Sequence, residues 1–280
     1  MRERKERLKE VSYYPGCSLH GTAREYDESC RGVSDLLGIK LSELKDWNCC
    51  GASSAHCTDK DLSIALAGRN LDIANKGGRE LLVPCVACFS RLKAAEAETE
   101  KEGVPIRYAL DFFSDEPVIE EIKKRLVRPL SGLKIVCYYG CLAVRPPQLT
   151  GVKEYENPQH MDKLMGAIGA EPLPWSYKTD CCGSSLMLVR TDIVKKLTGR
   201  ILSMAREAEV DCIVVGCPIC QANLDTRQGE LASETGETYD LPIIYFTELI
   251  GLALGHRDVK KWLSRHIVDP VKVLSARGLI

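Results

Sequence analysis

Long apolar runs and an excess of charge of one sign are both missing from this sequence of 280 residues. Its apolar segments, such as residues 213–215, are far shorter than the roughly 20 residues that a membrane-spanning helix needs. Lys and Arg number 38 against 39 Asp and Glu, and no basic stripe predicts binding to nucleic acid or to a membrane surface. Residues 1–10 are basic, but no apolar stretch follows them to make a signal peptide. The sequence therefore predicts a cytoplasmic protein with no transmembrane segment, peripheral to a membrane only through partners.

Familiar cofactor motifs are missing as well. There is no GxGxxG fingerprint, so the sequence encodes no flavin or nicotinamide site of that type. The ferredoxin run C-x2-C-x2-C does not occur, and the one C-x4-C-x2-C spacing, formed by Cys212, Cys217 and Cys220, has no fourth cysteine after it. Cysteine itself is abundant, with fourteen residues. Because a cytoplasmic protein keeps its thiols reduced, metal binding or redox chemistry explains these cysteines better than a disulfide framework does.

A tandem duplication accounts for ten of the fourteen cysteines. Each copy holds a leading cysteine, then a Cys-Cys-Gly motif and, after 33 further residues, a Cys-x-x-Cys motif. In chain order the ten are Cys17, Cys49, Cys50, Cys85 and Cys88, then Cys141, Cys181, Cys182, Cys217 and Cys220. The flanks agree too, since YPGC matches YYGC and VPIRYA matches LPIIYF. We expect two cysteine-rich domains, at residues 1–130 and 131–280. The four remaining cysteines, Cys30, Cys57, Cys137 and Cys212, are predicted to be ordinary buried or half-buried thiols.

Short apolar segments alternate with helical patterns in both copies. Strands are predicted at residues 11–16, 79–84 and 105–109, and again at 133–140, 211–216 and 242–246. Helices are predicted at 59–78 and 191–209, capped by Asp59 and Thr191, and at 114–132 and 256–274. This alternation predicts an α/β fold of two small parallel, Rossmann-like units related by a pseudo-twofold axis. The cysteines would then lie at the carboxyl ends of strands, where open α/β sheets bind their ligands.

Five thiols in each copy exceed the needs of one tetrahedral zinc ion. Neighbouring side chains in an extended segment point apart, so the two cysteines of each Cys-Cys-Gly motif reach different metals more easily than one ion. Thiolates are the usual ligands of iron–sulfur clusters, which are several ångströms across. The pattern therefore favours an iron–sulfur cluster in each copy. Zinc in one of the two sites and dithiol redox chemistry are the alternatives.

With these motifs the sequence resembles the B subunit of heterodisulfide reductase and its relatives, the tandem cysteine-rich CCG-domain proteins. The resemblance covers roughly residues 11–250 and includes all ten motif cysteines. It implies two non-cubane [4Fe-4S] clusters, one held by each set of five cysteines. It also implies that a small disulfide lies between the clusters, and that each cluster gives one electron and takes one sulfur. We therefore expect an oxidoreductase acting on disulfides or related sulfur groups, as the catalytic subunit of a complex.

The resemblance also implies partners. A ferredoxin-like protein with cubane [4Fe-4S] clusters, corresponding to the C subunit of such complexes, would deliver electrons. A flavin-containing protein, corresponding to their A subunit, would supply electrons to this ferredoxin-like protein. The substrate would be a small disulfide or thiol, a persulfide or a lipoyl-bound sulfur species. A second hypothesis is an electron-relay subunit of a respiratory or organic-acid-oxidising complex, without a substrate site of its own.

Two further side chains are candidates for contact with the substrate. His20 follows the first leading cysteine and could donate a proton to a released thiolate, or it could order the loop. Arg145 follows the second leading cysteine and could pair with an anionic substrate group, or it could form an ordinary salt bridge.

Overall fold

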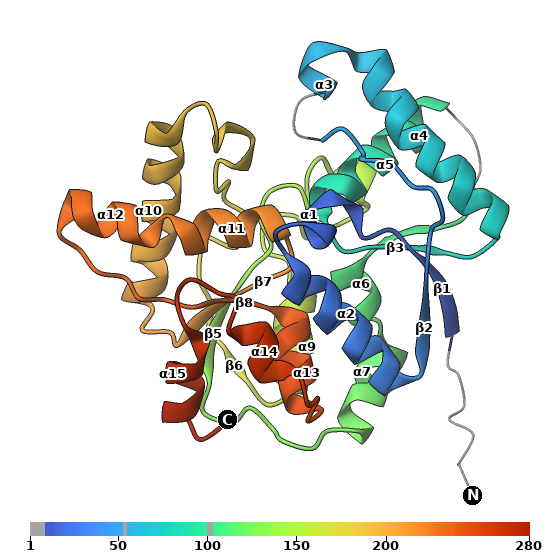
Figure 1. Ribbon diagram of the computed structural model, residues 1–280. Helices are drawn as coiled ribbons and strands as arrows, with labels where there is room; N and C mark the ends of the chain where they lie inside the picture. The colour runs from blue at the N-terminus through green and yellow to red at the C-terminus, as the bar shows by residue number, and fades with distance from the viewer. Residues whose placement is uncertain (1–8, 53–54, 100–102) are drawn as a thin grey trace, which may run out of the picture.

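Two four-stranded parallel sheets form the framework of the protein, as a computed structural model describes it for residues 9–52, 55–99 and 103–280 (Figure 1). The basic segment at residues 1–8 lies outside the described residues. The strand order is β2-β1-β3-β4 in one sheet and β6-β5-β7-β8 in the other, with every pairing parallel. The two orders are equivalent strand for strand. The predicted α/β fold of two tandem parallel units is therefore confirmed.

The elements follow one another in the same sense in both halves of the chain. The first half contains β1 (Lys9–Tyr13), α1 (Gly16–His20), α2 (Arg24–Leu37), β2 (Ile39–Glu43), α3 (Ala55–Thr58), α4 (Lys60–Gly77), β3 (Leu81–Val83), α5 (Val86–Thr99), β4 (Ile106–Tyr108), α6 (Ala109–Phe113) and α7 (Glu116–Lys124). The second contains β5 (Lys134–Tyr138), α8 (Pro147–Thr150), α9 (His160–Ala167), β6 (Glu171–Pro172), the 3-10 turn η1 (Ser184–Leu186), α10 (Thr191–Glu207), β7 (Cys212–Val215), α11 (Pro218–Thr226), α12 (Gln228–Thr235), β8 (Ile243–Tyr245), α13 (Phe246–Ala253), α14 (Val259–Leu263) and α15 (Pro270–Ala276).

All six strands that the sequence predicts are present, and two edge strands were missed. The inner strands β3 and β7 are fully buried, which is typical of a parallel sheet covered on both faces. The edge strand β2 is mostly half-buried or exposed, and β6 has only two residues. Such segments carry too little apolar periodicity to stand out in a sequence.

The helix predictions need three corrections. Asp59 caps α4 as predicted, accepting a hydrogen bond from the Leu62 N–H at 2.9 Å. Thr191 does not cap α10, because it is the first helical residue, and Arg190 stands at the cap position without a side-chain bond. The helix predicted at 114–132 is only α7, and the one at 256–274 is broken into α14 and α15, with Pro270 opening the second. No helix in the described part of the chain combines the length and apolarity needed to cross a membrane.

Helices are exchanged between the two halves. The helices α13 and α14, which follow the last strand of the second half, pack on α2 of the first half. Their counterparts α6 and α7 in the first half pack on α9 of the second (Figure 1). Close approach is possible because Gly32 in α2 and Gly251 in α13 lie against the ring of the buried Trp262. One continuous apolar core therefore runs through both halves.

The four cysteines outside the duplicated motifs divide into two kinds. Cys30, Cys137 and Cys212 are fully buried, as predicted. Cys57 is exposed, so the prediction is wrong for this residue. The short helix α3 carries it at an outer edge, where residues 57–62 are all exposed.

Candidate metal centre

Each leading cysteine is presented by a glycine that packs against a thiol of the Cys-x-x-Cys motif. Gly16 and Gly140 have φ values of +70° and +71°, a conformation that side chains disfavour. A Cβ atom on Gly16 would lie 2.9 Å from Cys88 Sγ, and one on Gly140 would lie 3.0 Å from Cys220 Sγ. Both backbone conformation and space therefore require glycine here, and the leading loop closes over the same thiol in both halves.

In the first half the two adjacent cysteines turn to different partners. Cys49 Sγ lies 3.9 Å from Cys17 Sγ, and both residues are exposed. Cys50 Sγ lies 3.3 Å from Cys88 Sγ, and both are buried. The motif thus gives its two thiols different partners, one outer and one inner, while Cys49 and Cys50 also hydrogen-bond with each other.

The second half repeats this arrangement. Cys182 Sγ lies 3.6 Å from Cys220 Sγ in the buried interior. Cys181 is exposed and hydrogen-bonds with the half-buried Cys141, the leading cysteine. Both halves therefore pair their thiols in the same way, although different numbers of residues separate the leading cysteine from the Cys-Cys-Gly motif.

Backbone contacts hold the two Cys-Cys-Gly loops in the same conformation. The Gly51 N–H donates to Cys49 Sγ at 3.4 Å, and the Gly183 N–H donates to Cys181 Sγ at 3.3 Å. A tyrosine hydroxyl also donates to the carbonyl before each motif. These bonds run from Tyr14 to Asn48 at 2.8 Å and from Tyr138 to Asp180 at 2.6 Å. The matched YPGC and YYGC segments were the sequence signal for these tyrosines.

The first thiols of the two Cys-x-x-Cys motifs meet between the halves. Cys85 and Cys217 are both buried, and their side chains share a hydrogen bond across the junction between the two halves. Each motif opens a helix, α5 at Val86 and α11 at Pro218. Helix N-termini favour thiolate over thiol, because the helix dipole stabilises negative charge there.

Two further helix contacts join the halves. The helix α1, which carries Cys17, contacts α11, and α8, which follows Cys141, contacts α5. The segments that begin at the two leading cysteines therefore approach the Cys-x-x-Cys helix of the other half.

The donor set fits a thiolate-bound cluster better than it fits one ion. Hydrogen bonds from Cys49 and Cys88 lower the pKa of the Cys50 thiol, and one from Cys141 lowers the pKa of Cys181 to about 6. Each half thus holds a thiol disposed to ionise, as metal binding requires. Within residues 9–52, 55–99 and 103–280, no three His, Cys, Asp or Glu side chains converge as they would around one metal ion. Five thiols in each half are suited to a larger object with several metal atoms.

His20 and Arg145 both have partners within their own halves. His20 Nε2 lies 3.1 Å from Glu43 Oε1, and its ring packs edge-on against Trp47. Arg145 pairs with Glu156 at 2.8 Å and donates to the Thr179 carbonyl at 3.2 Å. These contacts support a loop-ordering role for His20 and a salt bridge for Arg145.

Tyr26 is a residue of this region that the sequence did not indicate. Its hydroxyl lies 2.8 Å from the Gly216 carbonyl oxygen and 3.3 Å from that of Pro84, the residues just before the two Cys-x-x-Cys motifs. Nothing in its helix sequence distinguishes it from a core aromatic, since its role depends on contact with the distant second half.

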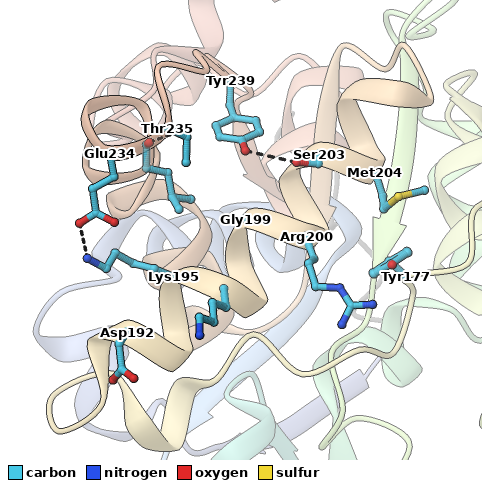
Figure 2. Close-up of a pocket in the computed structure, with 12 residues that line it drawn as sticks. Tyr177, Asp192, Lys195, Gly199, Arg200, Ser203, Met204, Glu234, Thr235 and Tyr239 are labelled. Carbon is cyan, nitrogen blue, oxygen red and sulfur yellow. Dashed lines mark hydrogen bonds and ion pairs between the residues drawn. The ribbon is translucent and has the colours of Figure 1, made fainter.

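A separate pocket of about 570 Å³ lies along α10 and α12 (Figure 2). Lys195 and Lys196 line it together with Arg200, and Lys195 pairs with Glu234 across it. None of the ten motif cysteines lines this pocket. It is therefore separate from the candidate centre.

Duplicated sheets with five thiols at the ends of their strands define a tandem cysteine-rich α/β protein. The chain matches the CCG cysteine-rich domain family at residues 11–93 and again at 135–225, and it belongs to that family.

Three known proteins show how far the similarity extends. The 8-methylmenaquinol:fumarate reductase membrane anchor subunit of Wolinella succinogenes is 30% identical, over 95% of this chain and 99% of its own length. The B subunit of a ferredoxin/F(420)H(2)-dependent CoB-CoM heterodisulfide reductase of Methanosarcina acetivorans is 25% identical, over 96% of this chain and 97% of its own. The crystal structure of a hypothetical protein from Helicobacter pylori shares the fold, with a TM-score of 0.74 at 11% identity over 94% of this chain. The chain spans about half of that protein, 52% of its length.

Proposed function

We propose that this chain is an iron–sulfur subunit of a reductase complex and that it cleaves a small disulfide between two non-cubane [4Fe-4S] clusters. The observation that carries the proposal is the repeated division of five thiols into an outer pair, an inner pair and one junction thiol. Similarity over nearly full length to proteins named as subunits of reductase complexes supports the complex.

The residues that would hold the clusters are the ten motif cysteines. Cys17, Cys49, Cys50, Cys85 and Cys88 would ligate one cluster, and Cys141, Cys181, Cys182, Cys217 and Cys220 the other. When bound, each cluster would supply one electron, so the pair delivers the two that disulfide cleavage consumes. Two protons complete the conversion of one disulfide into two thiols. The exposed Cys17, Cys49 and Cys181 mark the side from which a substrate reaches the centre.

The electrons would come from a partner, because the chain carries no GxGxxG fingerprint and no complete four-cysteine ferredoxin motif. A ferredoxin-like [4Fe-4S] protein fed by a flavin protein is the partner we propose, in the cytoplasm or at a membrane through the complex. Zinc in one of the two sites has less support, since each half offers five thiols and a tetrahedral zinc ion takes four ligands.

A second candidate is an electron-relay subunit without its own substrate. It is favoured by the 30% identity to a protein named as a membrane anchor subunit of a fumarate reductase, whose name mentions no disulfide. In this case the clusters would pass electrons onward, and the thiol pairs would serve only as ligands.

Anaerobic purification followed by iron and acid-labile sulfide assays tests the proposal. Two clusters predict about eight irons per chain, with an EPR signal of the oxidised protein that changes when 2-mercaptoethanol is added. Turnover of hydroxyethyl disulfide with a reduced viologen would then support the disulfide reductase. An EPR signal that does not change with the thiol, together with no turnover of the disulfide, would favour the electron relay. Zinc without iron would exclude both the disulfide reductase and the relay.

A further inference from the structure

The hydroxyl of Tyr108 is buried without a hydrogen-bond partner. Tyr108 ends β4 of the first half and is only 1% exposed. Its Oη has no partner among the residues that the structure describes. Leaving a buried hydroxyl unsatisfied costs about 1–3 kcal/mol, so such a group in a native protein needs an explanation.

This hydroxyl lies against the loop that presents Cys217 in the second half. A Cβ atom on Gly216 would overlap Tyr108 Oη, closer than any side chain permits. Gly216 does not have a positive φ, so space and not backbone conformation requires glycine at this position. The equivalent position in the first half is Pro84, which shows that the two loops differ here.

The thiols nearest to this hydroxyl belong mainly to the second half. Burial raises the pKa of Tyr108 well above its usual value, and the charges of Cys217, Asp111, Cys220 and Cys85 add to the effect. The hydroxyl therefore keeps its proton and is available to donate it to a thiolate or sulfide sulfur beside the loop. A tyrosine from one half thus lies against the loop that carries Cys217 of the other. The equivalent Tyr245 also has a hydroxyl without a partner among the described residues, but the charges that influence it most are the carboxylates of Glu25 and Glu248.

A second donor distinguishes the same site. Asn223 is fully buried, and its Nδ2 donates to the Cys182 carbonyl at 3.1 Å and lies 3.7 Å from Cys182 Sγ. Asn223 stands three residues after Cys220, and Arg91 occupies the matching position after Cys88. The amide donor is therefore present in the second half and replaced in the first.

We propose that Tyr108 donates a hydrogen bond to a sulfur of the second-half site and so makes the two sites electronically unequal. The inference rests on the proposed function, because it requires a cluster in each half. Hydrogen bonds to cluster sulfurs set the reduction potential, since they stabilise the negative charge added on reduction. The second-half site therefore has the higher potential, and an electron that enters the chain settles there first. Tyr108 is a positioning and tuning residue in this proposal and does not touch the substrate.

A redox titration followed by EPR tests the inference on the full chain, purified anaerobically. Tyr108→Phe keeps the ring and removes the hydroxyl. We expect one of the two cluster signals to shift to lower potential while the other stays, at unchanged iron content. Tyr239→Phe is the matched control, because that hydroxyl contacts Ser203 and Glu237 away from the cysteines and its loss should move neither signal.

Gly216→Ala provides an independent variant, since the added methyl group forces the Tyr108 hydroxyl away from the loop. This variant should lower the same reduction potential. It tests the inference by itself if Tyr108→Phe does not fold. Unchanged potentials in both variants, or equal shifts of both signals, would overturn the inference. A wild-type chain without two clusters would instead overturn the proposed function, so the two failures are distinguishable.

Discussion

Tyr26 and Gly216 are 190 residues apart in the chain, and the Tyr26 hydroxyl lies 2.8 Å from the Gly216 carbonyl oxygen. The same hydroxyl lies 3.3 Å from the Pro84 carbonyl oxygen. Its ring stacks on Tyr245, with the two ring centroids 4.2 Å apart and the planes nearly parallel. One side chain of α2 thus joins the backbones that carry both Cys-x-x-Cys motifs.

Replacement of Tyr26 by Phe should destabilise the protein by about 1–3 kcal/mol, because it leaves two buried carbonyl groups without this donor. Urea unfolding of the metal-free protein measures the change. Tyr239→Phe removes a partly exposed hydroxyl and should change the free energy of unfolding by less than half as much. Equal midpoints for the two variants would show that the Tyr26 hydroxyl does not join the halves.

Gly251 in α13 provides a test of the close packing around Trp262. A Cβ atom there would lie 2.6 Å from the Trp262 ring, so Gly251→Ala should cost about 1–3 kcal/mol through overpacking. Gly68 in α4 is the control, because nothing lies within 4 Å of a Cβ at that position. Gly68→Ala should stabilise the chain by up to about 1 kcal/mol through helix propensity. If both substitutions stabilised the protein, close packing of α13 on its neighbours would be contradicted.

His266 should make stability depend on pH above neutrality. Burial alone would lower the pKa of His266, but the Glu248 carboxylate, at 2.9 Å, raises it from 6.5 to about 9. The charged pair therefore stabilises the fold fully below about pH 6.5, and its contribution is lost as the pH rises to about 9. The shift corresponds to on the order of 3 kcal/mol.

Urea unfolding between pH 6 and pH 9 checks this dependence. The difference in unfolding free energy between wild type and His266→Asn should shrink as the pH rises. His160→Asn is the control, because burial lowers the pKa of His160 to about 4 and the side chain is neutral across this range. A constant difference between wild type and His266→Asn would refute the assignment of the charged pair.

Cysteine variants should divide according to the thiol pairs. Cys50→Ser and Cys182→Ser each remove one member of an inner pair, so each should lose about half of the bound iron, one cluster of two. Cys57→Ser should keep all of it, because Cys57 lies outside both sets of five. Iron and sulfide assays on the three anaerobic preparations distinguish these outcomes. Full iron in both inner-pair variants would contradict the ligand assignment.

The sequence could predict what is repeated and local. Three strands per half and the position of the cysteines at strand ends follow from apolar segments that occur twice. The edge strands β2 and β6 could not be predicted, because their pairing depends on neighbouring strands and not on their own pattern. The break between α14 and α15 had a local signal, since Asp269 caps α15 and Pro270 opens it, while tertiary contacts with Asp225 hold the backbone of Ile267 and Val268.

The candidate site shows the same division. The ten cysteines could be singled out from spacing alone, and the structure brings them together in pairs. The contacts between the halves could not be predicted, because Tyr26, Tyr108 and Gly216 act over long sequence separations. Single tyrosines and glycines in apolar segments carry no signal that separates such roles from ordinary packing.

The exchange of α6 and α13 between the halves has a consequence for the origin of the chain. The helix α2 of the first half is covered by α13 and α14 of the second half, so the first copy alone would leave that surface of α2 open. Two copies of a half-length chain could close it by a symmetric, domain-swapped association. The duplicated chain is what gene fusion of such a homodimer produces, with the meeting of Cys85 and Cys217 as the remnant of its twofold axis.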